Sequence, residues 1–171
     1  MKSLLILGAG GFGRMIKETA LALGYEEVLF LDDTAKDDDV IGRCCDYHLY
    51  HRDYSVAVAA FGNNKTRLFW TQKLLEEEYE VPAIVHPSAI VSPSVRLEPG
   101  CFIMQRAVVN MNTTIKMAAL INSGAVVDHD SIVEEGAHVG LGSVVKAHCV
   151  IEPGRKVEAG EVIFSTRRTI E

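Results

Sequence analysis

The sequence has no excess of basic residues, few aromatic residues and no long hydrophobic run. Among 171 residues, 17 are Lys or Arg and 23 are Asp or Glu, which gives a formal net charge of −6 at pH 7. Nucleic-acid binders and proteins that bind anionic membranes present clustered Lys and Arg to phosphates, so this balance argues against both kinds of partner. No segment approaches the roughly 18–20 apolar residues that cross a membrane. We therefore expect neither a nucleic-acid partner nor a membrane partner.

The sequence has few cysteines, and they show none of the spacings of a disulfide-rich protein or a zinc site. The four cysteines, at positions 44, 45, 101 and 149, form no Cys-x-x-Cys pair, which argues against a disulfide framework and against a zinc site. The apolar run Leu4–Leu7 ends at Gly8, and it is shorter than the roughly 7–15 residues of a signal peptide. We expect a cytoplasmic protein with free thiols and no bound metal.

The second half of the chain contains a strict six-residue repeat. Every sixth position from Val91 to Ile163 is aliphatic: Val91, Leu97, Ile103, Val109, Ile115, Ile121, Val127, Val133, Val139, Val145, Ile151, Val157 and Ile163. A helix cannot keep such a column on one face, because six residues rotate by about 600° around a helix of 100° per residue and the column drifts at every step. The repeat therefore indicates short strands rather than helices.

Two further columns of the repeat indicate corners between these strands. Three residues after most of the aliphatics stands a residue that tolerates positive φ or favours turns: Ser94, Gly100, Asn112, Gly124, Asp130, Gly136, Gly142, Gly154 and Gly160. The next column is mostly small residues. One inward aliphatic per strand cannot be buried within a single repeat, so the repeats must stack. Three strands and three corners close a triangular coil, and the sequence predicts a left-handed parallel β-helix.

The N-terminal segment predicts a Rossmann-like α/β domain. A strand at Ser3–Leu7 runs into Gly8-Ala9-Gly10-Gly11-Phe12-Gly13, an amphipathic helix follows, and a second strand ends at Asp32-Asp33. Glycines allow backbone N–H groups and the helix N-terminus to approach a phosphate, and the acid accepts hydrogen bonds from ribose hydroxyls. We therefore expect Gly8, Gly10, Gly11, Phe12, Gly13, Asp32 and Asp33 to bind a nucleotide. The alternative is a tight strand-to-helix turn without a ligand.

A third predicted strand, residues 56–60, leads into a polar loop before a second helix. The loop residues Gly62, Asn63, Asn64 and Lys65 follow this strand directly. One Asn is explained by helix capping, whereas the second Asn, beside Lys65, favours a ligand in the crevice at the carboxyl ends of the strands. Both interpretations stay open. We place the domain boundary between residues 1–82 and 83–171.

These motifs, taken together, resemble a known family. The run Gly-Ala-Gly-Gly-Phe-Gly-Arg, the later Phe-Gly-Asn-Asn-Lys-Thr-Arg, His86-Pro87-Ser88-Ala89 and the segment from Ile121 to Asp130 are similar to the sugar O- and N-acyltransferases of the sialic acid and bacillosamine biosynthesis type. The resemblance implies a nucleotide-linked sugar on the N-terminal domain, acetyl-CoA as co-substrate in a groove between subunits, and a homotrimer. It also implies that His129 is the general base and that His138 contacts the coenzyme.

The residues around His129 agree with that role. Asp128 and Asp130 flank it, and a neighbouring carboxylate raises the basicity of an imidazole and fixes its tautomer. We expect Asp130 to orient His129, with a plain corner residue as the alternative. One coil beyond His129 is Ala147, whose peptide N–H is a candidate oxyanion donor.

Other residues are assigned more simply. We expect Asn122 on the sugar side of the site, and His138, Gly142 and Lys146 at the coenzyme. Asn110, Asp128 and Lys146 should stack as a column on the exterior. His148 and His86 are taken as ordinary surface residues.

The predicted function is acetyl transfer from acetyl-CoA to an amino group or a hydroxyl of a nucleotide-linked sugar. The alternative is a trimeric nucleotide-sugar-binding protein without transferase activity, because the sequence ends at Glu171, soon after the last good repeat. Outward aliphatics beside the inward column, namely Val126, Ile132, Val144, Val150 and Val162, predict an apolar surface larger than soluble monomers expose, and hence a trimer contact.

Overall fold

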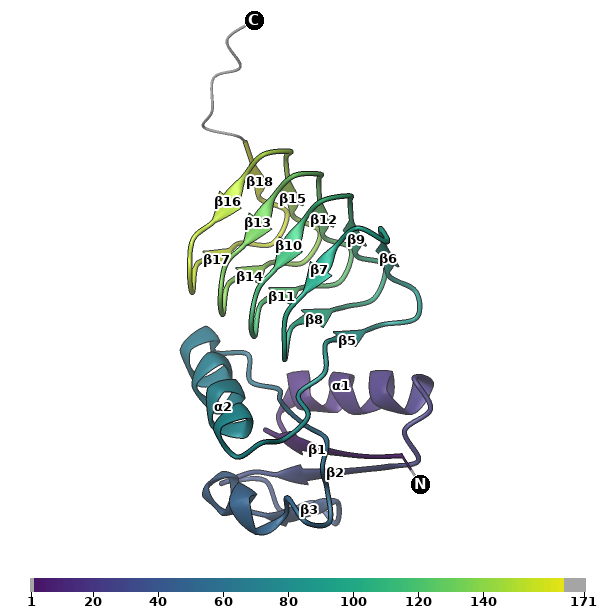
Figure 1. Cartoon of the computed structure of the whole chain (residues 1–171), viewed down its shortest axis with the longest axis vertical. Coiled ribbons are helices and arrows are strands. Elements are labelled where there is room, and N and C mark those ends of the chain that lie inside the picture. Colours follow the sequence, from purple (N-terminus) through teal and green to yellow (C-terminus); the bar gives the residue numbers. More distant parts are fainter. Residues whose placement is uncertain (1, 165–171) are drawn as a thin grey trace, which may run out of the picture.

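The computed structural model describes residues 2–164 and consists of an α/β unit at one end of a β-helix (Figure 1). The α/β unit has a four-stranded parallel sheet of order β3-β2-β1-β4. Its elements are β1 (Ser3–Leu7), α1 (Gly11–Ala22), β2 (Glu27–Leu31), β3 (Val40–Gly42), the 3-10 helix η1 (Cys44–Leu49), β4 (Ala57–Ala59) and α2 (Asn64–Glu76). The sequence predicts β1, β2, β4 and both helices, whereas β3 and η1 lie in a region it gives no pattern for.

Fourteen two-residue strands follow, each paired in parallel with the strand one coil away. They are β5 (Ile84–Val85), β6 (Ile90–Val91), β7 (Arg96–Leu97), β8 (Phe102–Ile103), β9 (Val108–Val109), β10 (Thr114–Ile115), β11 (Leu120–Ile121), β12 (Val126–Val127), β13 (Ile132–Val133), β14 (His138–Val139), β15 (Val144–Val145), β16 (Val150–Ile151), β17 (Lys156–Val157) and β18 (Val162–Ile163). They form three sheets, which we call face A (β7, β10, β13, β16), face B (β5, β8, β11, β14, β17) and face C (β6, β9, β12, β15, β18).

The left-handed β-helix confirms the predicted repeat. The aliphatic column is fully buried from Ile103 to Val157. Every sixth residue from Gly100 to Gly160 has φ between 55° and 71°. Two of these corners, at Arg106 and Ala118, carry side chains that rarely adopt this conformation. Stacking therefore sets the corner geometry even where the residue does not favour it.

The two halves share a hydrophobic core. Helix α1 packs over face B, where Ile84, Phe102 and Leu120 are buried in one cluster with residues of β1 and β2. Phe12 meets Phe102 edge to face, with ring centroids 5.2 Å apart. The α/β unit thus covers face B at β5, β8 and β11, and it leaves faces A and C of the β-helix uncovered.

Arg67 of α2 ties the α/β unit to the β-helix. Its side chain is completely buried, and its guanidinium donates to the carbonyl oxygens of Ala118 (2.8 Å) and Gly136 (3.0 Å) across the junction. It also donates to the Phe61 carbonyl and to Asn64 Oδ1. Burial lowers the pKa of Arg67 to about 10, so it stays a cation at neutral pH. Each nitrogen of the planar group donates to at least one protein acceptor, so Arg67 holds the junction together.

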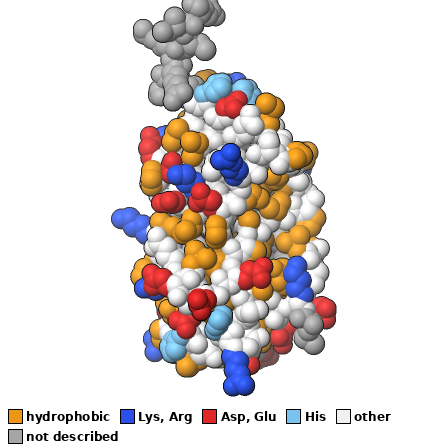
Figure 2. All heavy atoms as spheres, in the orientation of Figure 1, with side chains coloured by type: hydrophobic (Ala, Val, Ile, Leu, Met, Phe, Trp, Pro, Cys, Tyr) orange, Lys and Arg blue, Asp and Glu red, His pale blue; other side chains and the backbone are white. Residues whose placement is uncertain are grey.

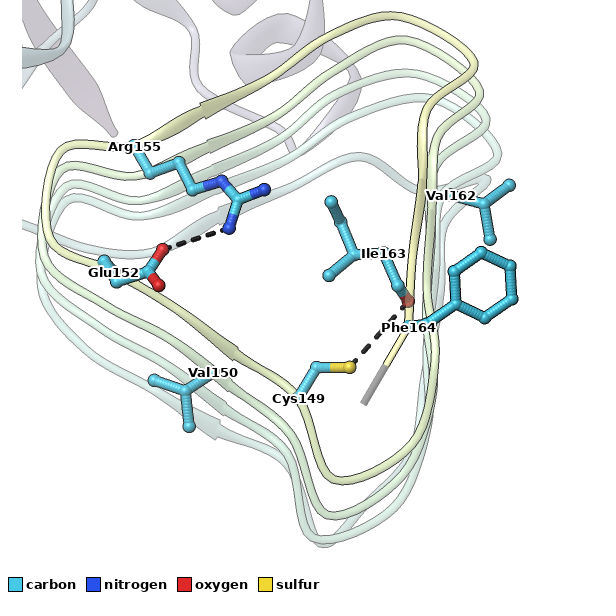
Figure 3. Close-up of a pocket in the computed structure, with 7 residues that line it drawn as sticks. All are labelled: Cys149, Val150, Glu152, Arg155, Val162, Ile163 and Phe164. Atoms are coloured by element: carbon cyan, nitrogen blue, oxygen red, sulfur yellow. Dashed lines mark hydrogen bonds and ion pairs between the residues drawn. The ribbon is translucent and has the colours of Figure 1, made fainter. Parts of the chain in front are cut away.

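The last coil shows how side chains alternate along the strands (Figure 3). Cys149 and Ile163 point into the coil, whereas Val150, Val162 and Phe164 point away from it. Val150 and Val162 are 51% and 43% exposed. The predicted outward aliphatics are therefore outward here, but they divide between face A (Ile132, Val150) and face C (Val126, Val144, Val162) rather than sharing one face.

Hydrophobic side chains form patches on the surface of the β-helix, between charged side chains (Figure 2). The outward column of face C is aliphatic throughout: Ile90, Val108, Val126, Val144 and Val162. Among the described residues, no helix has the length and apolar character needed to cross a membrane.

Candidate functional site

The predicted nucleotide-binding residues meet at the carboxyl edge of the α/β sheet. Gly8 has φ +101°, and the glycine run that follows β1 forms the first turn of α1. Gly13 allows close packing, because a Cβ there would lie 1.9 Å from the Gly8 carbonyl oxygen. A Cβ at Gly10 or Gly11 would instead meet nothing within 4 Å. The loop therefore has a structural glycine, Gly13, and two exposed glycines that packing does not explain.

Asp32 closes this loop from the adjacent strand. Its Oδ2 accepts the Ala9 N–H at 2.8 Å, and its Oδ1 accepts the N–H groups of Thr34 and Ala35, also at 2.8 Å. Burial acts to raise the pKa of Asp32, but these hydrogen bonds outweigh it and lower the pKa to about 2. Asp32 is thus an anion that organises the loop. The neighbouring Asp33 is about half exposed and has a protein donor on one oxygen, the Cys44 N–H at 3.2 Å.

The loop after β4 lines a cavity of about 390 Å³ together with the β-helix. The lining residues are Gly62, Asn63, Asn64, Lys65, Gly154 and Lys156. Asn63 caps α2, since its side chain accepts the Thr66 N–H at 3.0 Å. Asn64 is engaged at the junction, where it donates to the Gly154 carbonyl and accepts from Arg67.

Capping and the junction therefore account for both asparagines of this loop. Lys65 and Lys156 give the cavity positive charge beside the N-terminus of α2, which favours an anionic group. The sequence offered no signal for Lys156, because its approach to the loop arises only when the two halves pack together.

The β-helix carries a histidine–aspartate pair at the corner between faces C and A, which we call the His129 corner. His129 Nδ1 lies 2.7 Å from Asp130 Oδ2. Asn112, one coil away, donates to Asp130 Oδ1 at 3.1 Å. The hydrogen bonds from His129 and Asn112 lower the pKa of Asp130, which is therefore an anion at neutral pH. Hydrogen bonding at Nδ1 leaves Nε2 as the atom that can take a proton from outside.

Neighbouring residues complete the His129 corner. Asp128 accepts the His129 N–H and the Asn110 side-chain amide, both at 2.9 Å, and the predicted column of Asn110, Asp128 and Lys146 is present as a stack of exterior residues. The Ala147 N–H has no acceptor among residues 2–164. His148, which the sequence indicates only as an ordinary surface residue, packs its ring edge-on against His129 with centroids 5.3 Å apart.

His138 and Asn122 lie on face B beside Arg67. Asn122 Nδ2 is 3.1 Å from His138 Nε2. Burial, with smaller contributions from Arg67 and Lys156, lowers the pKa of His138 to about 4, so the ring is neutral at pH 7. If Nε2 accepts from Asn122, the proton resides on Nδ1, which is buried and has no hydrogen-bond partner within the described part of the chain. A buried donor without a partner costs free energy.

The structure does not bring all the predicted site residues of one chain together. His129, Asp130, Lys146 and Ala147 lie at the His129 corner, between faces C and A. Asn122 and His138 lie on face B, and Gly142 lies at the corner between faces B and C. Face C separates the two sets.

Known proteins match both the α/β unit and the β-helix. Residues 3–74 match the family model of the PglD N-terminal domain. PerB from Caulobacter crescentus, solved with CoA and GDP-perosamine, is 27% identical with a TM-score of 0.83 over 96% of this chain and 89% of that chain. The acetyltransferase domain of PglB from Neisseria gonorrhoeae is 28% identical with a TM-score of 0.71 over 96% and 92% of the two chains.

The same PglB domain, solved with acetyl coenzyme A, is 26% identical with a TM-score of 0.72 over 95% and 92% of the two chains. The similarities thus extend over nearly the whole chain rather than over the β-helix repeat alone. Together with the match of the N-terminal domain, they show that the chain is similar in sequence and fold to sugar acetyltransferases of the bacillosamine and perosamine type.

Proposed function

We propose that this protein transfers an acetyl group from acetyl-CoA to an amino group of a nucleotide-linked sugar. The observation that carries the proposal is the His129 corner, where Asp130 holds Nδ1 of a partly exposed histidine at 2.7 Å. A histidine held in this way serves as a general base for a nucleophile that loses a proton as it attacks. PerB, which binds CoA and GDP-perosamine, and the PglB domain, which binds acetyl coenzyme A, support both substrates.

The reaction needs one proton acceptor and one oxyanion donor. The sugar nitrogen attacks the thioester carbonyl, a C–N bond forms, and the amine proton passes to His129 Nε2. The Ala147 N–H donates to the oxyanion of the tetrahedral intermediate. Collapse breaks the C–S bond, and the proton held by His129 goes to the departing thiolate to give CoA. Asp130 stabilises the imidazolium that exists between the two steps.

The nucleotide sits on the α/β unit. The exposed backbone of Gly10 and Gly11 and the positive cavity lined by Lys65 and Lys156 provide two places for a diphosphate. Asp33 retains exposed carboxylate surface for a ribose hydroxyl. Asp32, whose oxygens already accept three backbone N–H groups, acts by shaping the loop.

The assembly is a homotrimer. A cyclic trimer uses heterologous contacts, in which two different faces of each subunit meet. Faces A and C are the two that the α/β unit leaves uncovered, and both carry outward aliphatics. The coenzyme lies in a groove between two subunits.

Ile132→Glu should dissociate the trimer. Ile132 lies on face A between Thr114 and Val150, and a carboxylate buried there without a partner costs more than the contact gains. Light scattering at micromolar concentration should report a trimer for the wild type and a smaller, inactive species for the variant. Leu21→Glu, on the exposed side of α1, is the matched control and should stay trimeric. A stable wild-type monomer would contradict both the assembly and the shared site.

Gly11→Val should weaken binding of the nucleotide sugar and leave acetyl-CoA binding unchanged. The new side chain has room in the free protein, so the fold is retained, but it occupies the space through which the backbone approaches a phosphate. Calorimetry with each substrate separately measures the two effects. Unchanged affinity for the nucleotide sugar would reduce the loop to a turn.

Measuring whether the protein binds acetyl-CoA distinguishes an acetyltransferase from a protein that only binds nucleotide sugars. Titration calorimetry with acetyl-CoA should give a saturable heat, and a thermal-shift screen of nucleotide sugars should identify the acceptor. Acetyl-CoA that binds with no measurable affinity would overturn the proposed transfer.

A further inference from the structure

We propose that the His129 corner is also a binding site for a divalent transition metal of the zinc class, formed by His129, Asp130 and His148, and that the bound metal inhibits acetyl transfer. The metal site depends only on the geometry of this corner. The inhibition rests, in addition, on the proposed function.

Coil stacking creates the cluster. Asp130 and His148 occupy equivalent corners one coil apart, with φ of 55° and 60°, and the His148 N–H donates to the His129 carbonyl at 3.2 Å. Two side chains that are eighteen positions apart in the sequence thus project from the same edge as His129. Only at this corner, within residues 2–164, do three such side chains come together.

The donor atoms match the preferences of zinc. One nitrogen from each histidine and one carboxylate oxygen from Asp130 all lie within 4.8 Å of one another. Tetrahedral zinc with bonds of about 2.0–2.1 Å places its ligands about 3.3 Å apart. The side chains of His129 and Asp130 are 42% and 37% exposed, and His148 is exposed. Rotations about surface side-chain bonds can therefore close the remaining distance. Three protein ligands leave a fourth position for water.

The surroundings suit a cation. The carboxylate of Asp128 lies at the same corner, fixed by the His129 N–H and Asn110. The Asn112 side-chain amide donates to Asp130 Oδ1 at 3.1 Å, and a hydrogen bond of this kind orients a carboxylate that binds a metal. Lys146 is the opposing charge, and it lies on the exposed exterior next to Asp128. Among residues 2–164, two carboxylates against one lysine leave the corner net negative.

Metal binding and catalysis exclude each other at this corner. A neutral imidazole has one lone pair, on whichever nitrogen lacks the proton. A metal on either nitrogen of His129 uses that lone pair, so no atom remains to accept the proton of the substrate. The metal also competes for Asp130, which otherwise orients the ring.

Binding is tested with Co²⁺ and Zn²⁺ on the untagged full chain. Zn²⁺ calorimetry should show one site per chain with micromolar or tighter affinity, and Co²⁺ should give the visible absorption of a site with nitrogen and oxygen ligands. His148→Asn keeps a residue that tolerates positive φ and removes the imidazole, and it should weaken binding by at least about tenfold. His48→Asn, at an exposed histidine of the α/β unit, is the matched control and should bind as the wild type does.

Inhibition is tested in the acetyl-transfer assay. Zn²⁺ should inhibit the wild type reversibly, EDTA should restore activity, and His148→Asn should need about tenfold more Zn²⁺ for the same inhibition. Zinc binding that is absent, or equal in the wild type and His148→Asn, overturns the metal site. Zinc binding that depends on His148 in a protein without transferase activity supports the metal site and contradicts the proposed function. Inhibition that is equal in the wild type and His148→Asn overturns the regulatory part.

Discussion

His129→Ala is expected to lower turnover by roughly 10²–10⁴-fold, because a positioned general base contributes about that much to rate. The ring lies on the surface of a coil and makes its only hydrogen bond from the side chain, among residues 2–164, to Asp130. Its removal should therefore leave the fold and the assembly intact. Steady-state kinetics with acetyl-CoA and the nucleotide sugar measures the effect, and it should fall on kcat more than on KM.

The control for this variant is His48→Ala, which changes an exposed histidine far from the β-helix and should leave kcat unchanged. Circular dichroism and light scattering should be the same for all three proteins. Activity of His129→Ala within a factor of two or three of the wild type would remove His129 from the mechanism.

Arg67→Met should destabilise the protein by about 2–4 kcal/mol. The methionine retains most of the buried stem, but it removes donors from the carbonyls of Ala118, Gly136 and Phe61 and from Asn64. Buried acceptors that lose their donors each carry a desolvation penalty of about 1–3 kcal/mol, which is reduced where a second donor remains. For a chain of this length the loss corresponds to a decrease in Tm of roughly 4–16 °C.

Lys73→Met is the matched control for Arg67→Met. Lys73 lies on the same helix, its side chain is 37% exposed, and it pairs with Glu76 on the surface. An exposed pair of this kind is worth little, so the Tm of this variant should change by less than about 2 °C. A similarly small change in Arg67→Met would show that the junction does not depend on the guanidinium.

The β-helix was predictable because every coil has the same structural requirements. Each coil needs one buried aliphatic per strand and one positive φ per corner, and the sequence states both requirements every six residues. The prediction weakened where stacking overrides residue preference. Ala118 and Arg106 adopt positive φ without any signal in their own chemistry, because their neighbours in the stack fix the corner.

The contacts between distant segments were not predictable. Counting one coil from His129 leads to Ala147. This count does not predict that the neighbouring side chain, His148, packs against the ring of His129. The glycine pattern likewise predicts that Asp32 contacts a ribose. In the structure, the Asp32 carboxylate oxygens instead accept hydrogen bonds from backbone N–H groups of the protein. The role of Arg67 was not predictable for the same reason, because its acceptors lie in three segments that are distant in the sequence.

The measurement that tests the central claim most directly is mass spectrometry of nucleotide-linked amino sugars incubated with the protein and acetyl-CoA. The account predicts that one sugar gains a single acetyl group, that free CoA forms in equal amount, and that His129→Ala abolishes both changes under the same conditions. A panel of nucleotide-linked amino sugars, all of which remain unmodified by wild-type protein that binds acetyl-CoA, would contradict it.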